Sequence, residues 1–544
     1  MKKINLVSIV VLCIILLGGC ASEPNQEVNI IPQPQQVTMA DGGFTLSPKT
    51  VINVIKGADD LTPACTFMST LVEKSFGQPL SVVNGEIKRD AINIAVDPSM
   101  RADAYDLTVG KKAIDIKAGS SKAVFYAMQS LRQMMPVGVE KGEKMDKIRI
   151  QNVRIQDEPR LAYRGTMLDV CRHFFTVDEV KTFIDMLALH KLSVFHWHLT
   201  DDQGWRIEIK KYPKLTEIGS QRKQTVIGKN TGKYDGTPYG PYFFTQEEIK
   251  DVIQYAADRY ITIIPEIELP GHALAALASY PELGCTGGPY EVCQMWGVFS
   301  EVFCPGNEKT FEFWEGVLEE VAELFPGEII HIGGDECPRD AWKKCKKCQA
   351  RMKKEKLKEE GDLQNYVVHR IEEFMKTKGK RILGWDEILE GDVSKTAIVM
   401  SWRGKKGGIE GAKRGNEVVM VPNDYAYFDY YQAKPVENEP FGIGGYVPVE
   451  KVYSLDPTEG LTPEEGEKII GVQANLWAEY IKTFSHAQYM LLPRMAAIAE
   501  VGWTPLARKD YDNFLKRAKL MTQRYEALGY NFAKHILQEA KTNE

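Results

Sequence analysis

From residue 160 onward, short apolar runs alternate with amphipathic segments, and this alternation constrains the fold more than any other feature of the chain. Helical patterns such as Thr176–His190, Thr245–Arg259 and Thr310–Phe325 fill most of the gaps between the runs. Strands that alternate with helices indicate a parallel sheet, and eight such units indicate a closed (β/α)8 barrel. The expected strands are Tyr163–Val170, Leu192–Leu199, Ile261–Ile267, Glu328–Ile332, Arg381–Trp385, Thr396–Trp402, Glu417–Val421 and Ile469–Ala474.

A smaller unit is expected before the barrel. Ala91–Val96 and Ala113–Ile116 have the pattern of short strands, and Ser121–Met135 has apolar residues at helical spacing. The predicted fold class is therefore α/β, a (β/α)8 TIM barrel preceded by a small α/β domain. The expected boundaries are 28–155 for the small domain, 156–505 for the barrel and 506–544 for a C-terminal helical segment.

The first 27 residues have the pattern of an export signal rather than of a folded domain. Two lysines precede an apolar run, Ile4–Leu17, which is short for a membrane span and fits a signal peptide. The Gly-Gly-Cys that follows resembles a bacterial lipoprotein processing site, which predicts that residues 1–20 form the signal and that Cys20 is the lipidated N-terminus. Residues 21–27 then form a tether. The alternative is an ordinary signal peptide with a chance cysteine.

This reading predicts an exported protein that is lipid-anchored in the bacterial cell envelope, in the periplasm or at the outer membrane, and meets the membrane through its anchor only. The formal net charge of −6 gives no basic excess, so no nucleic-acid partner is expected. One basic run, 343–358, is followed at once by acidic residues and contains no aromatic ones, which favours a solvated helix face.

Six of the ten cysteines lie between residues 285 and 348, in a compartment that permits disulfides. Cys345-x-x-Cys348 could indicate zinc or redox chemistry. No second C-x-x-C and no histidine pair accompanies it at zinc-site spacing, which favours a structural disulfide or free buried thiols. No metal and no cofactor is expected. The six cysteines are Cys285, Cys293, Cys304, Cys337, Cys345 and Cys348.

Carboxylates, histidines and tryptophans follow the predicted strands. Because a barrel of this class carries its chemistry at the C-terminal ends of its strands, these side chains are expected to converge on one rim. Carboxylates bind hydroxyls and supply acid–base catalysis, and flat indoles pack against the apolar face of a sugar ring, so the combination indicates a sugar site. For a single tryptophan, core packing would be the better interpretation.

Several segments together resemble glycoside hydrolase family 20, whose best-known members are β-N-acetylhexosaminidases. The resemblance runs from about residue 30 to the low 500s, with the motifs in family order. Those segments are Pro159-Arg160, Met167–Val170, Arg172–Phe174, His196–Asp202, Pro270–His272, His331–Glu336 and Gly384–Glu387.

The resemblance implies a retaining, exo-acting hydrolase in which the substrate's own 2-acetamido oxygen is the nucleophile, an exception to the usual pair of separated carboxylates. Glu336 would protonate the leaving oxygen and Asp335 would orient the acetamide, with Tyr427 on its oxygen. Gly333-Gly334 would let the backbone turn before the pair, and the neighbouring carboxylate is expected to keep Glu336 protonated. The implied substrates are glycans with terminal N-acetylhexosamine.

The remaining site residues also follow predicted strands, and their roles are implied by the resemblance. Asp201 and His272 would lie close to the acid, with Glu268 orienting His272. Some relatives add a pocket tryptophan where this chain has Phe441–Val447 without one, which leaves that wall open. The expected substrate-binding residues are Arg172, Asp201, His272, Trp385, Trp402, Asp429, Trp477 and Glu479.

Three alternatives stay open. His196-x-His198 at the end of an early strand imitates the two-histidine motif of metal-dependent barrel hydrolases, although few histidines remain to complete such a site. A carbohydrate-binding protein without catalysis is a second. A family relative with a different cut, such as a lacto-N-biosidase or a sulfated-GlcNAc hydrolase, is a third.

Overall fold

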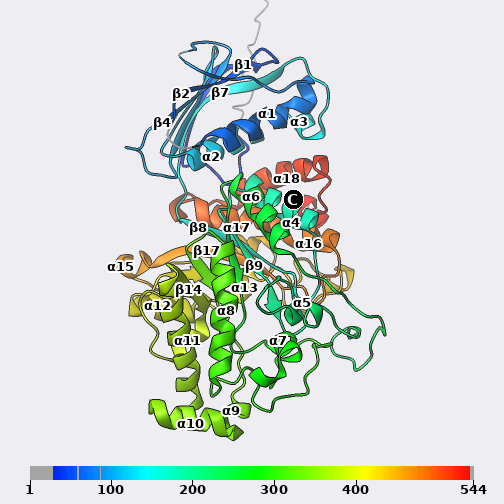
Figure 1. Ribbon diagram of the computed structural model, residues 1–544. Helices are drawn as coiled ribbons and strands as arrows, with labels where there is room; N and C mark the ends of the chain where they lie inside the picture. The colour runs from blue at the N-terminus through cyan, green and yellow to red at the C-terminus, as the bar shows by residue number, and fades with distance from the viewer. Residues whose placement is uncertain (1–27, 58–59, 86, 539–544) are drawn as a thin grey trace, which may run out of the picture.

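The computed structural model describes residues 28–57, 60–85 and 87–538, and these form a small domain above a larger barrel (Figure 1). The prediction about Cys20 and residues 1–27 falls outside the described residues. Within those residues, no helix combines the length and the apolar character that crossing a membrane requires.

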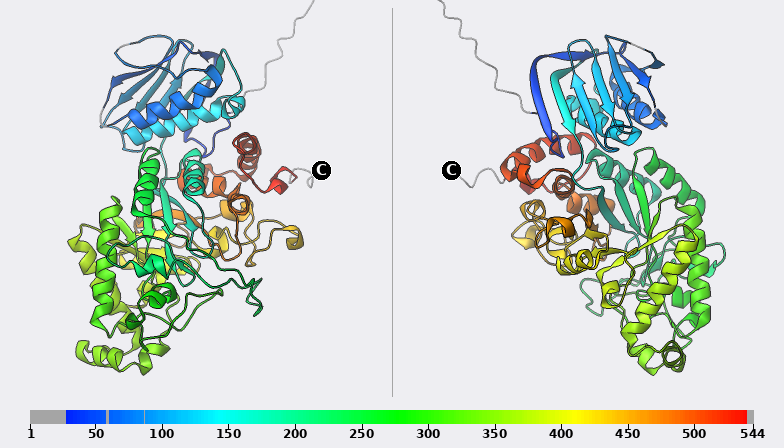
Figure 2. Two further views of the ribbon diagram at one scale, coloured as in Figure 1. Left: turned by 45° about the vertical axis from the view of Figure 1, so that its right-hand side comes forward. Right: turned by 90° about the vertical axis from the view of Figure 1, so that its left-hand side faces the viewer.

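The small domain is one sheet with its helices on a single face (Figures 1 and 2). Its strand order is β1-β7-β5-β6-β4-β2-β3, with the β2–β3, β2–β4 and β4–β6 pairs parallel. The expected helix is confirmed as α2, which Ser120 caps by accepting from the backbone N–H of Ala123. The elements are β1 (Gln36–Leu46), β2 (Val51–Lys56), α1 (Thr62–Phe76), β3 (Val82–Asn84), β4 (Ala91–Val96), β5 (Tyr105–Val109), β6 (Ile114–Ala118), α2 (Ser121–Met134), α3 (Gly138–Lys141) and β7 (Ile148–Asp157).

The predicted barrel is confirmed. Eight parallel strands close in the order β12-β13-β14-β15-β16-β17-β8-β9, and each overlaps one of the expected runs. A two-stranded hairpin, β10 (Thr200–Asp201) with β11 (Gly204–Trp205), follows β9 at the rim. The barrel strands are β8 (Tyr163–Asp169), β9 (Val194–His198), β12 (Thr262–Glu266), β13 (Ile329–His331), β14 (Arg381–Trp385), β15 (Ile398–Ser401), β16 (Val418–Met420) and β17 (Ile469–Leu476).

Helices surround the barrel, and their ends follow local sequence signals. Thr176 and Thr245 each open a helix with a complete capping box, because a glutamate three residues later bonds back to the cap. The helices are α4 (Val177–Leu189), α5 (Lys214–Glu217), α6 (Gln246–Ala257), α7 (Leu274–Ser279), α8 (Glu308–Leu324), α9 (Asp340–Lys344), α10 (Lys346–Glu355), α11 (Glu360–Thr377), α12 (Lys406–Arg414), α13 (Asn423–Ala426), α14 (Val449–Tyr453), α15 (Pro463–Gly466), α16 (Phe484–Leu491), α17 (Arg494–Trp503) and α18 (Tyr511–Ala527).

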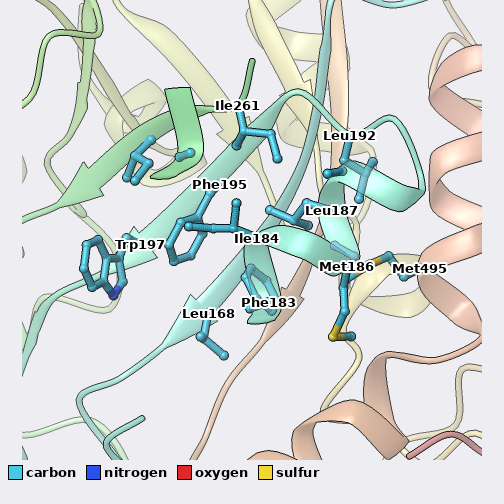
Figure 3. Packing of buried hydrophobic residues seen from close by; sticks show 14 of the residues in the cluster. Leu168, Phe183, Ile184, Met186, Leu187, Leu192, Phe195, Trp197, Ile261 and Met495 are labelled. Atoms are coloured by element: carbon cyan, nitrogen blue, oxygen red, sulfur yellow. The ribbon is translucent and has the colours of Figure 1, made fainter. Parts of the chain in front are cut away.

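The core between barrel and helices is dense and apolar. Phe183 and Ile184 of α4 lie against Phe195 of β9, and all three are fully buried (Figure 3). Phe195 and Trp197 have their ring centroids 5.4 Å apart and point out of the barrel, so the side chains between them point inward. This alternation sends His196 and His198 toward the barrel axis.

A buried ion pair joins the two domains. Lys191, just before β9, donates from Nζ to Ser130 Oγ at 2.6 Å and lies 3.7 Å from Asp157 of β7. Asp157 also accepts from the indole N–H of Trp503 at 2.9 Å. Since Lys191 precedes its strand, the N-terminal ends of the barrel strands face the small domain. The C-terminal ends therefore open on the opposite side.

Candidate active site

The loop after β13 turns through a run of left-handed residues. Gly333, Gly334 and Glu336 have φ values of 66°, 98° and 44°. A Cβ on Gly333 would lie 1.8 Å from Glu268 Oε2, so only glycine fits there. The expected turn before the acidic pair is confirmed, and it brings both Asp335 and Glu336 to the pocket although they are consecutive.

His272 links the two acidic residues. Its Nε2 lies 3.5 Å from Glu336 Oε2 and 3.8 Å from Asp335 Oδ2. Its Nδ1 lies 3.0 Å from Asp202 Oδ2 and 3.3 Å from Asp201 Oδ1. His272 is thus oriented from behind by two aspartates of the β10–β11 hairpin and presents its other nitrogen to the pair.

The expected partner of His272, Glu268, does not fill that role. Both carboxylate oxygens of Glu268 are buried without a hydrogen-bond partner among the described residues. Burial holds the pKa of Glu268 well above the ordinary carboxyl value, and the neighbouring Asp335 carboxyl adds to this shift. The chain instead uses Asp202, which directly follows Asp201 and was not singled out from the sequence.

The pKa shifts of the acidic pair run opposite to the expectation that Glu336 is kept protonated. The N–H of His272 lowers the pKa of Glu336, whereas burial raises the pKa of Asp335. Burial opposes a charge on His272, but Asp201 outweighs it and holds the pKa of His272 well above its usual value. Of the two neighbouring carboxyls it is therefore Asp335, the more buried one, whose pKa is raised.

Arg172 sits in a cage of acidic groups. Its Nη2 lies 2.9 Å from Asp201 Oδ2, and its Nη1 lies 3.2 Å from Asp169 Oδ2 and 3.9 Å from Glu479 Oε1. The guanidinium also lies 5.1 Å from the centroid of the Trp477 ring. These contacts hold the guanidinium at the pocket, where its planar set of N–H donors suits the recognition of hydroxyls.

Aromatic rings form part of the pocket wall. Trp402 and Tyr427 are stacked, with centroids 6.1 Å apart and planes 21° apart, and Tyr427 lies 6.5 Å from Trp477. Trp385 lies one layer deeper, 5.9 Å behind Trp477, and donates its N–H to Glu266 at 2.8 Å. Its expected place in the pocket wall stays a prediction.

A single pocket of about 320 Å³ gathers most of the expected site residues. It is of the size of the smaller ligand pockets in proteins. Among the described residues, Asp335 Oδ1 and Asp429 Oδ1 are buried without a hydrogen-bond partner, so each can accept from a ligand. The expected residues that line it are Arg172, Asp201, His272, Asp335, Glu336, Trp402, Tyr427, Asp429, Trp477 and Glu479.

Two loops complete the pocket with residues that sequence reasoning missed. Asn230 Oδ1 accepts from the backbone N–H of Trp296, and Asn230 Nδ2 donates to the Trp296 carbonyl, at 3.1 and 2.7 Å. Ile443 and Tyr480 line the same side. Asn230, Trp296 and Ile443 lie in loops far from a strand end, so strand-end positions could not reveal them, and a tryptophan in a loop was the one signal for Trp296. Tyr480 directly follows the predicted Glu479 after β17, and this position was the signal that could have found it.

The geometry disfavours the two-histidine metal alternative. Both ring nitrogens of His198 already face carboxylates, Nδ1 that of Glu266 and Nε2 that of Asp201 at 2.8 Å. His196 is fully buried, with Nδ1 2.9 Å from the Gln473 amide and Nε2 3.1 Å from Glu266. Both histidines thus place a ring nitrogen at the Glu266 carboxylate, which accounts for their burial without a metal ion.

Comparison of the sequence with protein families identifies a known class of enzyme. The description "Glycosyl hydrolase family 20, catalytic domain" covers residues 161–506, and "Glycosyl hydrolase family 20, domain 2" covers residues 27–158. The chain belongs to glycoside hydrolase family 20. The resemblance noted in the sequence is thereby confirmed over both domains.

Named members of family 20 lie close in sequence and structure. The β-hexosaminidase of Porphyromonas gingivalis is 43% identical over 534 residues, which cover 96% of this chain and 67% of that one. A β-hexosaminidase of Vibrio furnissii is 34% identical, covering 87% and 76%. The structure of an exo β-N-acetylglucosaminidase from Vibrio harveyi with N-acetylglucosamine has a TM-score of 0.82 at 34% identity, covering 93% and 78%. A mutant Streptomyces plicatus β-hexosaminidase with its product GlcNAc gives 0.81 at 30%, covering 93% and 96%.

Some family 20 relatives carry a further pocket tryptophan where this chain has Phe441–Val447. In this chain other residues form that part of the wall. Ile443 lines the pocket, and Phe441 lies outside it with its ring 5.3 Å from that of Tyr480. Lys229 donates from Nζ to the Ile443 carbonyl at 2.7 Å, which ties this segment to the Asn230 loop. In the place of that indole, the aliphatic side chain of Ile443 therefore lines the pocket, and exposed aromatic side chains lie around it.

Proposed function

We propose that this family 20 enzyme removes terminal, non-reducing β-linked N-acetylhexosamine from glycans with retention of configuration. One observation carries the proposal: Asp335 Oδ1 is buried, faces the pocket and lacks a hydrogen-bond partner among the described residues, directly beside Glu336. A buried carboxylate oxygen in this state needs a donor, and the acetamide N–H of the substrate is one.

The position of the pair favours substrate-assisted catalysis. A retaining enzyme with its own nucleophile places two carboxyl groups about 5 Å apart across the sugar. Asp335 and Glu336 are consecutive and both lie beside His272 Nε2, so they approach the sugar from one side. The acetamido oxygen then attacks the anomeric carbon, the glycosidic bond breaks, and an oxazolinium forms that water opens.

Each step needs a proton in a defined place. Glu336 protonates the leaving oxygen and later takes a proton from the attacking water. Its pKa is lowered in the free protein, and His272, with its raised pKa, lies 3.5 Å away as the proton source. Asp335 must be ionised to stabilise positive charge on the acetamide, and Tyr427 donates to the acetamido oxygen as it becomes nucleophilic.

The size of the pocket favours release of a single sugar. About 320 Å³ suits one N-acetylhexosamine ring, with Trp477 beneath it and Arg172, Asp429 and Glu479 on its hydroxyls. A disaccharide-releasing enzyme needs room for two rings.

A cyclic inhibitor tests the mechanism. A thiazoline analogue of the oxazolinium should bind at least 10²-fold more tightly than free GlcNAc, as transition-state and intermediate analogues do. Aryl β-GlcNAc and β-GalNAc should be cleaved, whereas the matching 2-hydroxy glucoside, which lacks the nucleophile, should not. Thiazoline affinity no better than that of GlcNAc would disprove substrate assistance. Release of intact disaccharide from a lacto-N-biose glycoside would replace the proposed cut.

We also propose that the enzyme is exported and lipid-anchored through Cys20, as the sequence before Val28 suggests. Growth with a labelled fatty acid should label the native protein but not the Cys20→Ala variant. Cys65→Ala serves as the matched control because its thiol is buried in the small domain. Equal labelling of the Cys20→Ala variant, or none of the native chain, would overturn the anchor.

A further inference from the structure

Four cysteines outside the catalytic pocket bring their sulfur atoms together. Cys304 Sγ lies 3.5 Å from Cys348 Sγ and 3.7 Å from Cys345 Sγ, and Cys285 Sγ lies 3.8 Å from Cys348 Sγ. All four sulfur atoms lie within 4.8 Å of one another. A tetrahedron with zinc–sulfur bonds of about 2.3 Å has edges of about 3.8 Å, so these distances fit a single metal ion at its centre.

The surroundings of the cluster suit bound thiolates. Cys304 and Cys348 are fully buried, and Cys345 caps the N-terminus of α10, with Cys348 in its first turn. Backbone N–H groups at a helix N-terminus stabilise negative charge. The N–H of Gly306 also bonds to the sulfur of Cys304. The lysines that flank the C-x-x-C, namely Lys343, Lys344, Lys346 and Lys347, offset the charge of a four-thiolate zinc site.

Backbone packing at the cluster is close enough to exclude a side chain. A Cβ on Gly306 would lie 2.2 Å from the backbone N of Cys348 and 2.5 Å from the carbonyl O of Lys347. The loop that carries Cys304 is thus pressed against the turn that carries the C-x-x-C. Such close packing of two turns brings cysteines from separate segments together at one point. A disulfide between any two of them would not require all four to meet there.

Buried apolar area contributes little to the stability of this region. The cysteines belong to a separate core of few side chains, built around Trp342, Met352 and Leu363. It supports α9 and α10, which project at the end of the molecule far from the small domain (Figure 1). Small cores of this kind are usually held by a disulfide or a metal, because the apolar area they bury is insufficient.

We infer that Cys285, Cys304, Cys345 and Cys348 bind one structural zinc ion that fixes two pocket-forming segments. Cys285 and Cys304 stand at the two ends of the loop that carries Trp296, and its base is closed by the Gly284–Phe303 bridge. Cys345 and Cys348 lie shortly after Glu336 in the same β13–α11 connection. The ion therefore ties the Trp296 wall to the segment of the catalytic acid.

This inference departs from the expectation of disulfides or free thiols drawn from the sequence. A spacing rule that looks for two C-x-x-C pairs fails here because the first two ligands are single cysteines 19 positions apart. The other cysteines of the stretch, Cys293 and Cys337, take no part in the cluster. Folding, and not spacing, assembles the site.

Metal content of the full chain is the direct test. The chain, purified without chelator or added metal, should contain about one zinc ion, released when its thiols are blocked with a mercurial. Cobalt exchanged into the site should give the intense visible bands of tetrahedral thiolate coordination. Cys304→Ser and Cys348→Ser should each lose at least nine-tenths of the zinc, whereas Cys65→Ser should retain it.

Kinetics then separate the inferred role from catalysis by metal. Zinc-free Cys348→Ser should raise KM more than it lowers kcat, and protease should cleave it between residues 285 and 304 where the native chain resists. Should the serine variants not fold, zinc content and the cobalt spectrum of the native chain still decide. Peptide mapping that finds two disulfides and no metal, or four free thiols that take up no zinc, would overturn the inference.

Discussion

His272 and Glu336 meet at 3.5 Å, and both hold a left-handed backbone, with φ of 45° and 44°. Such a conformation costs about 1–3 kcal/mol in a non-glycine residue and persists only when its surroundings enforce it. Two strained residues in mutual contact indicate that the loops after β12 and β13 are shaped to set this one distance. The distance over which a proton would pass from His272 to Glu336 is therefore set by the backbone conformation of these two loops.

Replacing the catalytic acid should remove turnover but not binding. In Glu336→Gln, kcat should fall by about 10²–10⁴-fold, the usual contribution of general acid catalysis. The loss should be much smaller for a dinitrophenyl glycoside, whose leaving group needs no proton. Comparing phenyl and dinitrophenyl substrates measures this, with Glu323→Gln, exposed on α8, as the control. Equal losses on both substrates would contradict the assignment.

The acid limb of the pH profile of kcat/KM should reflect the ionisation of Asp335. Burial raises the pKa of Asp335, and its ionised form is needed to hold the acetamide, so kcat/KM should fall as pH drops through that raised value. The limb therefore lies well above pH 4, where an ordinary aspartate titrates. Asp335→Asn should lose the limb and about 10²–10³-fold in kcat. A wild-type limb near pH 4 would show that another group controls it.

Removing the imidazole should move the alkaline limb. His272, whose pKa is held well above its ordinary value, is the proton source for Glu336, so the alkaline limb of kcat/KM follows loss of the His272 proton. In His272→Asn we expect that limb to move down by at least about half a pH unit while kcat falls. A purely structural role would lower kcat without moving the limb. His369→Asn on α11 is the control.

A site residue can be predicted from the sequence when its position is determined by residues near it in the chain. Strands and helices follow from short-range periodicity, and residues such as Asp335 and Trp402 are found because they come directly after strands. Trp296 lies some 30 residues beyond its strand, so its place depends on how a long loop folds back. The pKa order of Asp335 and Glu336 depends on His272, which comes from another strand, and no pattern near the pair reveals it.

The Gly333 turn should tolerate no side chain. Gly333→Ala combines a left-handed φ of 66° with a contact of 1.8 Å to Glu268, whereas Gly379 has φ 69° and open space around it. Gly379→Ala should cost about 1–2 kcal/mol, the price of the conformation alone. Gly333→Ala should cost clearly more, as chemical unfolding would measure. Equal costs would mean that Glu268 moves aside freely.

The contact between Lys191 and Asp157 has a consequence for how such enzymes can be divided. A barrel cut free at residue 160 would leave the Lys191 ammonium without its counter-charge, at a surface now open to water. Trp503 would lose the acceptor of its indole N–H at the same time. The small domain thus covers the N-terminal ends of the barrel strands, and a cut at residue 160 would divide this buried contact.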